Sequence, residues 1–225
     1  MAVPTLSRLQ HDPVRLRAYY LKALSLATFI TLPIVAVSVV LSEQIIRLIL
    51  GPQWMTAVTI FRFLALSALV QPVVTTTGWL YVATGRTDRM FKWGLFASGF
   101  IVLSFLVGLP YGADGVALCY AIVTLLLAVP CIWYATIGTQ ISMWDVIRSI
   151  GHPMGASVLA GGACFGARLA ISTMPLLPQT VICCAVMAVV YGFLMLSLRR
   201  KRTFYWSLLQ ELRSKTPQPN LKELT

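Results

Sequence analysis

Two arginines lie inside otherwise uncharged apolar runs, and they are the side chains in this sequence best placed to do chemistry. Arg62 comes a turn or two after the start of one run, and Arg168 comes about one turn before the end of another. A cation at the centre of a membrane helix costs about 2.5 to 3.5 kcal/mol on insertion scales, so it is often retained for function. Alternatively, each guanidinium reaches the nearby membrane interface while its aliphatic stem stays in the apolar layer.

For Arg62 the functional interpretation is specific. A planar guanidinium presents paired donors that match the oxygens of a phosphate. We therefore predict that Arg62 lines an internal aqueous cavity and binds the phosphates of an anionic substrate. For Arg168 the interfacial alternative is the leading interpretation.

The other reactive residue types are not placed for catalysis. The acids fall in loops, in the tail or at the ends of apolar runs, and the two histidines are far apart in sequence. The cysteines lie in apolar runs and show no CxxC spacing, as expected of small packing residues. We predict no catalytic residues, no metal site, no cofactor and no enzymatic activity. The residues concerned are Asp12, Glu43, Asp88, Asp114, Asp145, Glu211, Glu223, His11, His152, Cys119, Cys131, Cys164, Cys183 and Cys184.

The composition indicates that these residues belong to a membrane protein. Of the 225 residues, 58% are hydrophobic and only 11% are charged. The apolar residues form charge-poor runs of roughly 17 to 23 residues, which is the length that crosses a hydrocarbon core about 30 Å thick. Spanning segments must pair their backbone groups internally, and the runs lack the alternation of a barrel strand. The predicted fold class is therefore all-α integral membrane.

About six transmembrane helices are predicted, and they divide the chain into three parts. Residues 1–22 form a basic cytoplasmic segment with the end of a truncated helix, residues 23–198 form the bundle, and residues 199–225 form a basic tail. The tail is expected to form a short amphipathic helix on the membrane surface, and the alternative is an ordinary solvated basic tail. The predicted spans cover residues 23–41, 55–83, 93–109, 115–137, 153–171 and 179–198.

The positions of the charges predict the orientation of the bundle. The formal charge of +11 could suggest a nucleic-acid partner, but most cations lie in loops between apolar runs. Lysine and arginine concentrate before the first run, after the second, after the fourth and in the tail, whereas the alternate loops hold only Arg47. Cytoplasmic loops of membrane proteins carry such an excess. We predict cytoplasmic termini, contact with membrane lipids and no nucleic-acid partner.

Prolines and small residues predict features of the helices. Pro33, Pro72 and Pro130 lie within predicted spans, where each removes a hydrogen bond and favours a kink that could act as a hinge. Gly162 and Gly166 form a GxxxG pair in the fifth span, which predicts close packing against another helix.

Three stretches resemble a known family. Residues 4–24, 48–94 and 108–122 are similar to the oligosaccharide or lipopolysaccharide flippases of the multidrug/oligosaccharidyl-lipid/polysaccharide exporter superfamily. They include LGPQW at 50–54, TGRTDR at 84–89 and GLPYGADG at 108–115. The similarity is strongest over residues 4–150, and its specificity comes from the order and spacing of several weak motifs.

The resemblance implies two six-helix lobes around a central cavity, in which a lipid-linked sugar headgroup crosses the bacterial inner membrane. The chain has about half the length expected for the family. Its opening resembles the end of the family's eighth helix, so its spans would match most of the second lobe and the last two of about fourteen helices. We therefore expect a fragment or a truncated reading frame.

The implied function is export of an undecaprenyl-pyrophosphate-linked oligosaccharide for cell-surface polysaccharide biosynthesis. Arg62 would contact phosphate, while Gln71, Trp79 and Tyr81 would contact sugar. Polysaccharide polymerase or assembly proteins are the implied partners. The alternatives are a cation-coupled drug exporter of the same superfamily, a membrane-embedded glycosyltransferase or ligase, and a non-transporting scaffold of polysaccharide assembly.

Overall fold

The protein is built from helices throughout the described part of the chain, which comprises residues 13–171 and 174–197 in a computed structural model. Eight α-helices and two short 3-10 turns account for nearly all of these residues. The predicted all-α class is confirmed. In chain order the elements are α2 (Pro13–Val40), α3 (Ser42–Ile49), η1 (Pro52–Trp54), α4 (Ala57–Ser67), α5 (Gln71–Ala83), α6 (Thr87–Gly108), η2 (Leu109–Tyr111), α7 (Gly112–Thr136), α8 (Met143–Ala170) and α9 (Leu176–Ser197).

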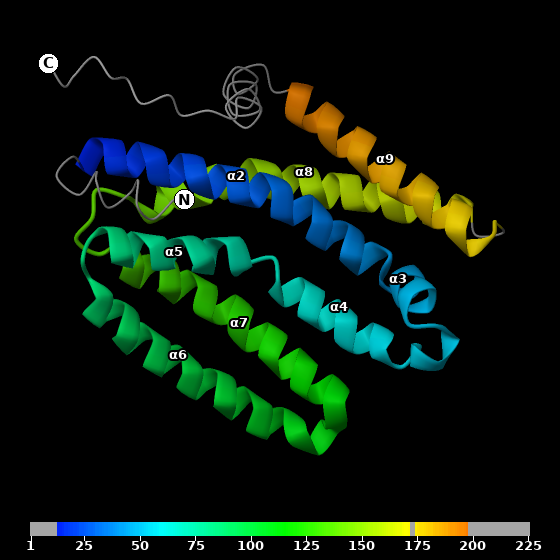
Figure 1. Cartoon of the computed structure of the whole chain (residues 1–225), viewed down its shortest axis with the longest axis horizontal. Helices are drawn as coiled ribbons and strands as arrows, with labels where there is room; N and C mark the ends of the chain where they lie inside the picture. Colours follow the sequence, from blue (N-terminus) through cyan, green and yellow to red (C-terminus); the bar gives the residue numbers. More distant parts are fainter. Residues whose placement is uncertain (1–12, 172–173, 198–225) are drawn as a thin grey trace, which may run out of the picture.

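The long helices form two packed groups (Figure 1). In one group α8 packs against both α2 and α9, and in the other α7 packs against α4, α5 and α6. Contacts of α2 with α4 and α5 join the groups. One apolar cluster, around Tyr20 and Leu80, connects α2, α5, α7 and α8, and a second, around Leu41 and Cys183, connects α2, α8 and α9.

The second predicted span is a broken helix. α4 and α5 are separated by a short break and bent by 41° relative to each other. Pro72 lies in the first turn of α5, where its missing N–H leaves no helical hydrogen bond unmade. The proline therefore starts a second helix, whereas Pro33 and Pro130 lie inside α2 and α7, which continue through them.

A tight hairpin connects α6 to α7 through η2. Gly108 at the end of α6 and Gly115 in the first turn of α7 allow the two backbones to touch. A Cβ on Gly108 would lie 2.6 Å from the Cα of Val116, and a Cβ on Gly115 would lie 2.8 Å from the carbonyl oxygen of Gly108. Gly112 turns the chain with a φ of 71°.

By length and composition, three stretches of the described residues could cross a membrane. They are Val14–Val40, Thr87–Thr136 and Leu176–Ser197, and the bent pair of α4 and α5 would make a fourth. The stretch Thr87–Thr136 contains both arms of the α6–α7 hairpin. α8 has 28 residues but is not among these stretches. The chain is a multi-pass membrane protein, and the predicted count of about six spans is not confirmed.

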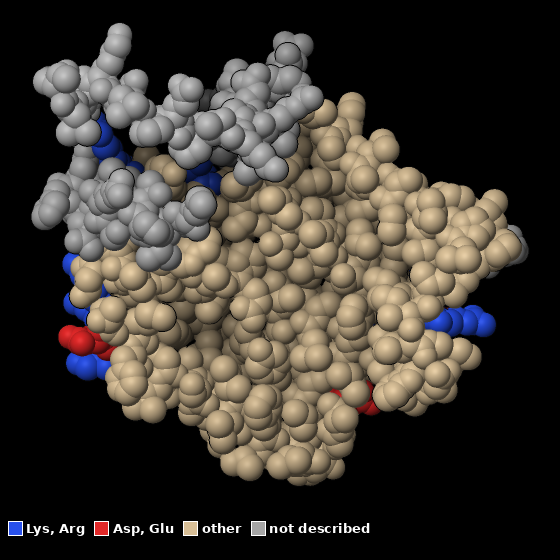
Figure 2. Space-filling view, in the orientation of Figure 1, with Lys and Arg blue, Asp and Glu red and all other residues tan. Residues whose placement is uncertain are grey.

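The helix ends with basic neighbours lie together. Figure 1 places the start of α2, the α5–α6 connection and the α7–α8 connection at one end of the molecule, which we call the basic end. The visible Lys and Arg side chains gather mainly at this end (Figure 2). The predicted grouping of the basic loops is thus seen in the fold, and their placement in the cytoplasm stays a prediction. The predicted amphipathic tail lies outside the described residues.

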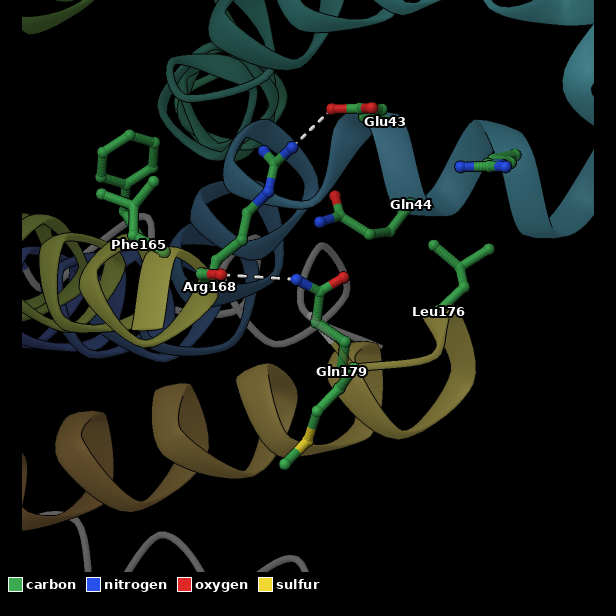
Figure 3. Close-up of a pocket in the computed structure, with 9 residues that line it drawn as sticks. Glu43, Gln44, Phe165, Arg168, Leu176 and Gln179 are labelled. Carbon is green, nitrogen blue, oxygen red and sulfur yellow. Dashed lines mark hydrogen bonds and ion pairs between the residues drawn. The ribbon is translucent and has the colours of Figure 1, made fainter. Parts of the chain in front are cut away.

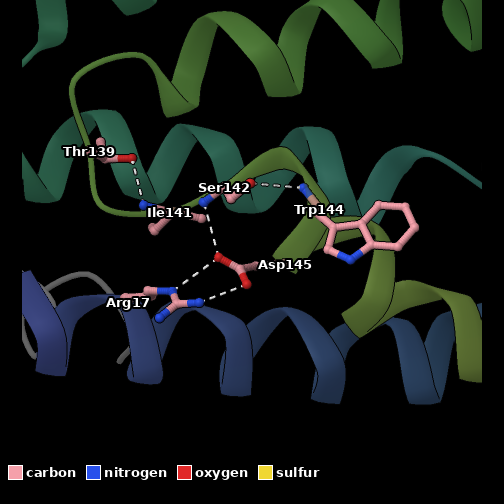
Figure 4. Close-up of polar contacts among 6 residues, drawn as sticks. All are labelled: Arg17, Thr139, Ile141, Ser142, Trp144 and Asp145. Atoms are coloured by element: carbon pink, nitrogen blue, oxygen red, sulfur yellow. Dashed lines mark hydrogen bonds and ion pairs between the residues drawn. The ribbon is translucent and has the colours of Figure 1, made fainter.

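An ion pair joins the start of α2 to the first turn of α8 at the basic end. Arg17 donates from Nε and Nη2 to the two carboxylate oxygens of Asp145, at 3.0 and 2.7 Å (Figure 4). Asp145 also accepts from the backbone N–H of Ser142 and completes a capping box at the start of α8. Hydrogen bonding to Arg17 lowers the pKa of Asp145, so the carboxylate is charged at neutral pH.

At the basic end, Arg86 also binds the backbone carbonyls that follow α7. Its Nη1 and Nη2 donate to the carbonyl oxygens of Ile137 and Gly138, at 2.6 and 2.7 Å, and Arg89 adds a bond to Ile137 at 3.0 Å. These carbonyls follow the last turn of α7, where helix geometry leaves acceptors without partners. Gly138 has a φ of 74°, which suits glycine.

Replacing Arg86 with alanine is therefore expected to loosen the α7–α8 connection. Loss of its hydrogen bonds should lower the free energy of unfolding by about 1 to 3 kcal/mol. Limited proteolysis of the detergent-solubilised protein should show faster cleavage within residues 137–142. Lys92→Ala, which removes an exposed cation from α6, should leave the cleavage rate unchanged. Equal rates for both variants would contradict a bracing role for Arg86.

Candidate functional site

The two arginines singled out in the sequence converge on the first turn of α3. Arg62 of α4 donates from Nε to the hydroxyl of Ser42 at 2.7 Å. Arg168 of α8 donates from Nη2 to Oε2 of Glu43 at 2.5 Å. Consecutive residues of one short helix thus hold cations from two different helices, at the end of the molecule opposite the basic end (Figure 1).

Arg168 is fixed on two sides. Besides pairing with Glu43, it donates from Nη1 to the carbonyl oxygen of Val40 at 3.1 Å, in the last turn of α2. The Arg168 side chain is 20% exposed and that of Glu43 is 40% exposed. The guanidinium therefore lies at the end of the bundle, where it connects α8 to α2 and α3. That this end lies at a membrane interface stays a prediction.

A polar pocket of about 420 Å³ lies beside this ion pair, between α3, α8 and α9 (Figure 3). We call it the α3 pocket. Gln179 of α9 donates to the carbonyl oxygen of Arg168 at 3.4 Å, so α9 is tied to the end of α8. Gln44 is 97% buried and its Oε1 has no hydrogen-bond partner. The full lining is Glu43, Gln44, Arg47, Phe165, Arg168, Leu169, Met174, Leu176 and Gln179.

Two of the predicted substrate contacts share a different pocket. Gln71 and Trp79 lie two turns apart on α5, and both line a pocket of about 240 Å³ between α2 and α5. Pro72, Thr75 and Thr76 of α5 line the same pocket, and Ala27 and Thr31 line it from α2. Amide, hydroxyl and indole groups in one hollow can hydrogen-bond to a sugar and stack against its ring. We call this the α5 pocket.

The other two predicted contacts are separate from the α5 pocket. Tyr81 is only 2% exposed and packs in the core cluster, with its ring centroid 6.5 Å from that of Tyr134. Arg62 is held at Ser42 and lines neither the α3 pocket nor the α5 pocket. The structure thus brings together Gln71 and Trp79, while it places Arg62 and Tyr81 elsewhere.

Several residues of the α3 pocket were not predicted as site residues from the sequence. Glu43 and Arg168 are 125 positions apart, but both were assigned to the same non-basic boundary of the bundle. Two residues of opposite charge at the same boundary of the bundle could have indicated an ion pair. No such indication existed for Gln44, Arg47 and Gln179. The short helix α3, which brings Gln44 and Arg47 to the same pocket as Gln179 of α9, was not predicted.

Groups that bind metals are not assembled in the described part of the chain. No group of three or more His, Cys, Asp or Glu side chains suited to a metal ion occurs within residues 13–171 and 174–197. Cys164 of α8 and Cys183 of α9 are buried in the same apolar cluster, where they fill space between helices.

The fold and these sites define an all-α, multi-pass membrane protein whose polar pockets lie between its helices. Comparison with known proteins shows what parts of the chain are similar to. Residues 1–59 match the family model described as polysaccharide biosynthesis protein. No solved structure matches the chain.

Three curated proteins are similar to longer parts of the chain. Lipopolysaccharide biosynthesis protein WzxC of Escherichia coli K12 is 27% identical over 55% of this chain and 25% of its own length. Amylovoran biosynthesis protein AmsL of Erwinia amylovora is 32% identical over 46% of this chain and 26% of its own length. Teichuronic acid biosynthesis protein TuaB of Bacillus subtilis 168 is 23% identical over 75% of this chain and 35% of its own length.

These matches confirm the predicted resemblance. The matched parts span only 25% to 35% of the length of these relatives.

Proposed function

We propose that this chain is part of a flippase that moves a lipid-linked oligosaccharide across the bacterial inner membrane for cell-surface polysaccharide biosynthesis. The observation that carries the proposal is the set of relatives, whose names refer to three different polymers: lipopolysaccharide, amylovoran and teichuronic acid. A step common to such polymers, in a protein made of apolar helices, is the transfer of a precursor through the membrane. That step breaks no covalent bond and needs no catalytic residues.

The α5 pocket supports this function. It combines the amide of Gln71 and the indole of Trp79 with threonine hydroxyls on a helix that is bent at its start. A sugar headgroup needs such polar and aromatic contacts inside the membrane, and a break between two half-helices is a common feature of transporter binding sites. Gln71 and Trp79 are accordingly the proposed sugar contacts.

The proposed orientation follows from the basic end. Arg86, Arg89 and Lys92 follow α5, and Arg17 lies near the start of α2, so the basic end would face the cytoplasm. The substrate would enter there and leave at the end that carries α3. Polysaccharide polymerase or other assembly proteins would receive it on that side.

A deletion and a reconstitution together test the function. Deleting the complete gene should cause lipid-linked repeat units to accumulate, and re-expressing the gene should clear them. The purified protein in vesicles should then make a fluorescent lipid-linked sugar accessible to a quencher on the opposite leaflet. A glycosyltransferase, ligase or scaffold would leave that sugar on its original leaflet, and this result would reject the transport proposal.

Arg62 provides a sharper test of substrate binding. Arg62→Gln removes the charge proposed to bind phosphate, and we expect transport to fall about tenfold or more, the loss of one charge-assisted contact. Ser42→Ala is the matched control, since it removes the hydrogen-bond partner of Arg62 and keeps the cation. Normal transport by a normally inserted Arg62→Gln variant would leave only the interfacial interpretation of this residue.

A further inference from the structure

The α3 pocket lies apart from the α5 pocket, at the opposite end of the molecule from the basic loops (Figures 1 and 3). We propose that it binds a membrane phospholipid whose phosphodiester headgroup carries hydroxyl groups, the chemistry of phosphatidylglycerol. The inference does not depend on the transport proposal, because it rests on the charges, the buried amide and the apolar wall of this pocket alone.

The charges of the α3 pocket favour an anion. Its lining holds two arginines, Arg47 and Arg168, against one acid, Glu43. Glu43 pairs with Arg168, and the Val40 carbonyl takes a further donor of the same guanidinium. Arg47 is exposed and has no ion-pair partner among residues 13–171 and 174–197. One positive charge is therefore left for a phosphate, which a guanidinium binds through two parallel hydrogen bonds.

Gln44 selects the rest of the headgroup. It comes from the first turn of α3 and lines the pocket together with Arg168 and Gln179 (Figure 3). Its Oε1 is buried and accepts no hydrogen bond, and such an unmade bond is costly. An ionised phosphodiester offers no donor to this oxygen, whereas a hydroxyl next to the phosphate does. The buried amide thus favours a phosphodiester headgroup that carries a hydroxyl over one that carries none.

The apolar side of the pocket fits a lipid better than a soluble phosphate. Phe165 and Leu169 of α8 are 50% and 62% exposed, and Met174 is 46% exposed, although all three line the pocket. They form an apolar wall directly beside Arg168, which follows Phe165 by three positions on α8. An acyl chain can cover this wall while its headgroup occupies the polar part.

Thermal stability of the full-length protein in a neutral detergent tests the proposal. The probes are phosphatidylglycerol, phosphatidylmethanol, phosphatidylcholine and inorganic phosphate, each titrated separately. We expect phosphatidylglycerol to raise the Tm most. Arg47→Gln should weaken its apparent affinity about tenfold. Gln44→Met should remove the preference for phosphatidylglycerol over phosphatidylmethanol, which is an anionic phosphodiester without a hydroxyl. Lys92→Gln, which removes one exposed charge from α6 at the basic end, should bind like the parent protein.

Each alternative result has a definite meaning. Equal Tm shifts from phosphatidylglycerol and phosphatidylcholine, or an unchanged affinity in Arg47→Gln, would overturn the proposal. A shift from inorganic phosphate without one from phosphatidylglycerol would assign the pocket to a free anion and overturn the lipid. If Gln44→Met does not fold, the Arg47→Gln titration and the comparison of the two anionic lipids in the parent protein still decide the matter.

Discussion

Replacing Gly108 with alanine is expected to disrupt the α6–α7 hairpin and to lower the free energy of unfolding by about 3 kcal/mol, near the upper end of overpacking effects. A Cβ at this position would lie 2.6 Å from the Cα of Val116 and 2.8 Å from the carbonyl oxygen of Gly115. Both atoms belong to the backbone of α7, so no side-chain rotation can relieve the contact. The hairpin would have to open, and α6 would lose its packing against α7.

A matched control lies on the same helix. Gly99 also belongs to α6, but a Cβ there would have no atom within 4 Å. Gly99→Ala should be neutral, or should stabilise the helix by roughly 0.5 to 1 kcal/mol through reduced chain entropy. Thermal denaturation in detergent, followed by circular dichroism, measures both variants. A Gly108→Ala protein as stable as Gly99→Ala would show that the two helices are not so close.

Reversing the charge of Glu43 is expected to produce the second large effect. In Glu43→Arg, the partly buried Arg168 loses its partner and faces another cation. We expect the free energy of unfolding to fall by about 2 to 3 kcal/mol. This is less than for a fully buried ion pair, because the side chains of Arg168 and Glu43 are 20% and 40% exposed. The links from α3 to α8 and from α8 to α2 should weaken together, since Arg168 also binds the carbonyl of Val40.

The double variant Glu43→Arg with Arg168→Glu makes the test specific. Restoring opposite charges should recover most of the lost stability, and the double-mutant cycle gives the coupling energy of the pair. Asp114→Arg serves as the control, because Asp114 is an exposed acid in the first turn of α7 with no ion pair within the described residues. If the effects of the two reversals simply add, the ion pair does not stabilise the fold.

Much of the architecture could be predicted from the sequence because the membrane imposes it locally. A run of apolar residues must become a helix in lipid, whatever it packs against. The prediction of an all-α membrane protein and the gathering of basic helix ends on one side needed only the lengths of these runs and the positions of lysine and arginine. Pro72 indicated an irregularity at the break between α4 and α5, although it predicted a kink within one helix and not two separate helices.

The candidate sites depended on contacts between segments far apart in sequence. Polarity and aromatic character selected Gln71, Trp79 and Tyr81 together, but helical geometry separates them. Gln71 and Trp79 lie two turns apart on the face of α5 toward α2, whereas Tyr81, two residues later, points into the core. The sequence therefore predicted the residue types of the site and could not decide which of them share a pocket.

By itself, the sequence determined that the chain is helical and where the cations lie along it, because both follow from local composition. Only the tertiary structure decided that Arg62 and Arg168 meet α3, and that Gln44 and Arg47 line one pocket with Gln179. Helices of similar hydropathy can pack in many orders, since lipid solvates their apolar faces equally well. The observed packing order depends on close contacts between different helices, such as that of Gly108 with Val116. Such contacts cannot be recognised from one segment alone.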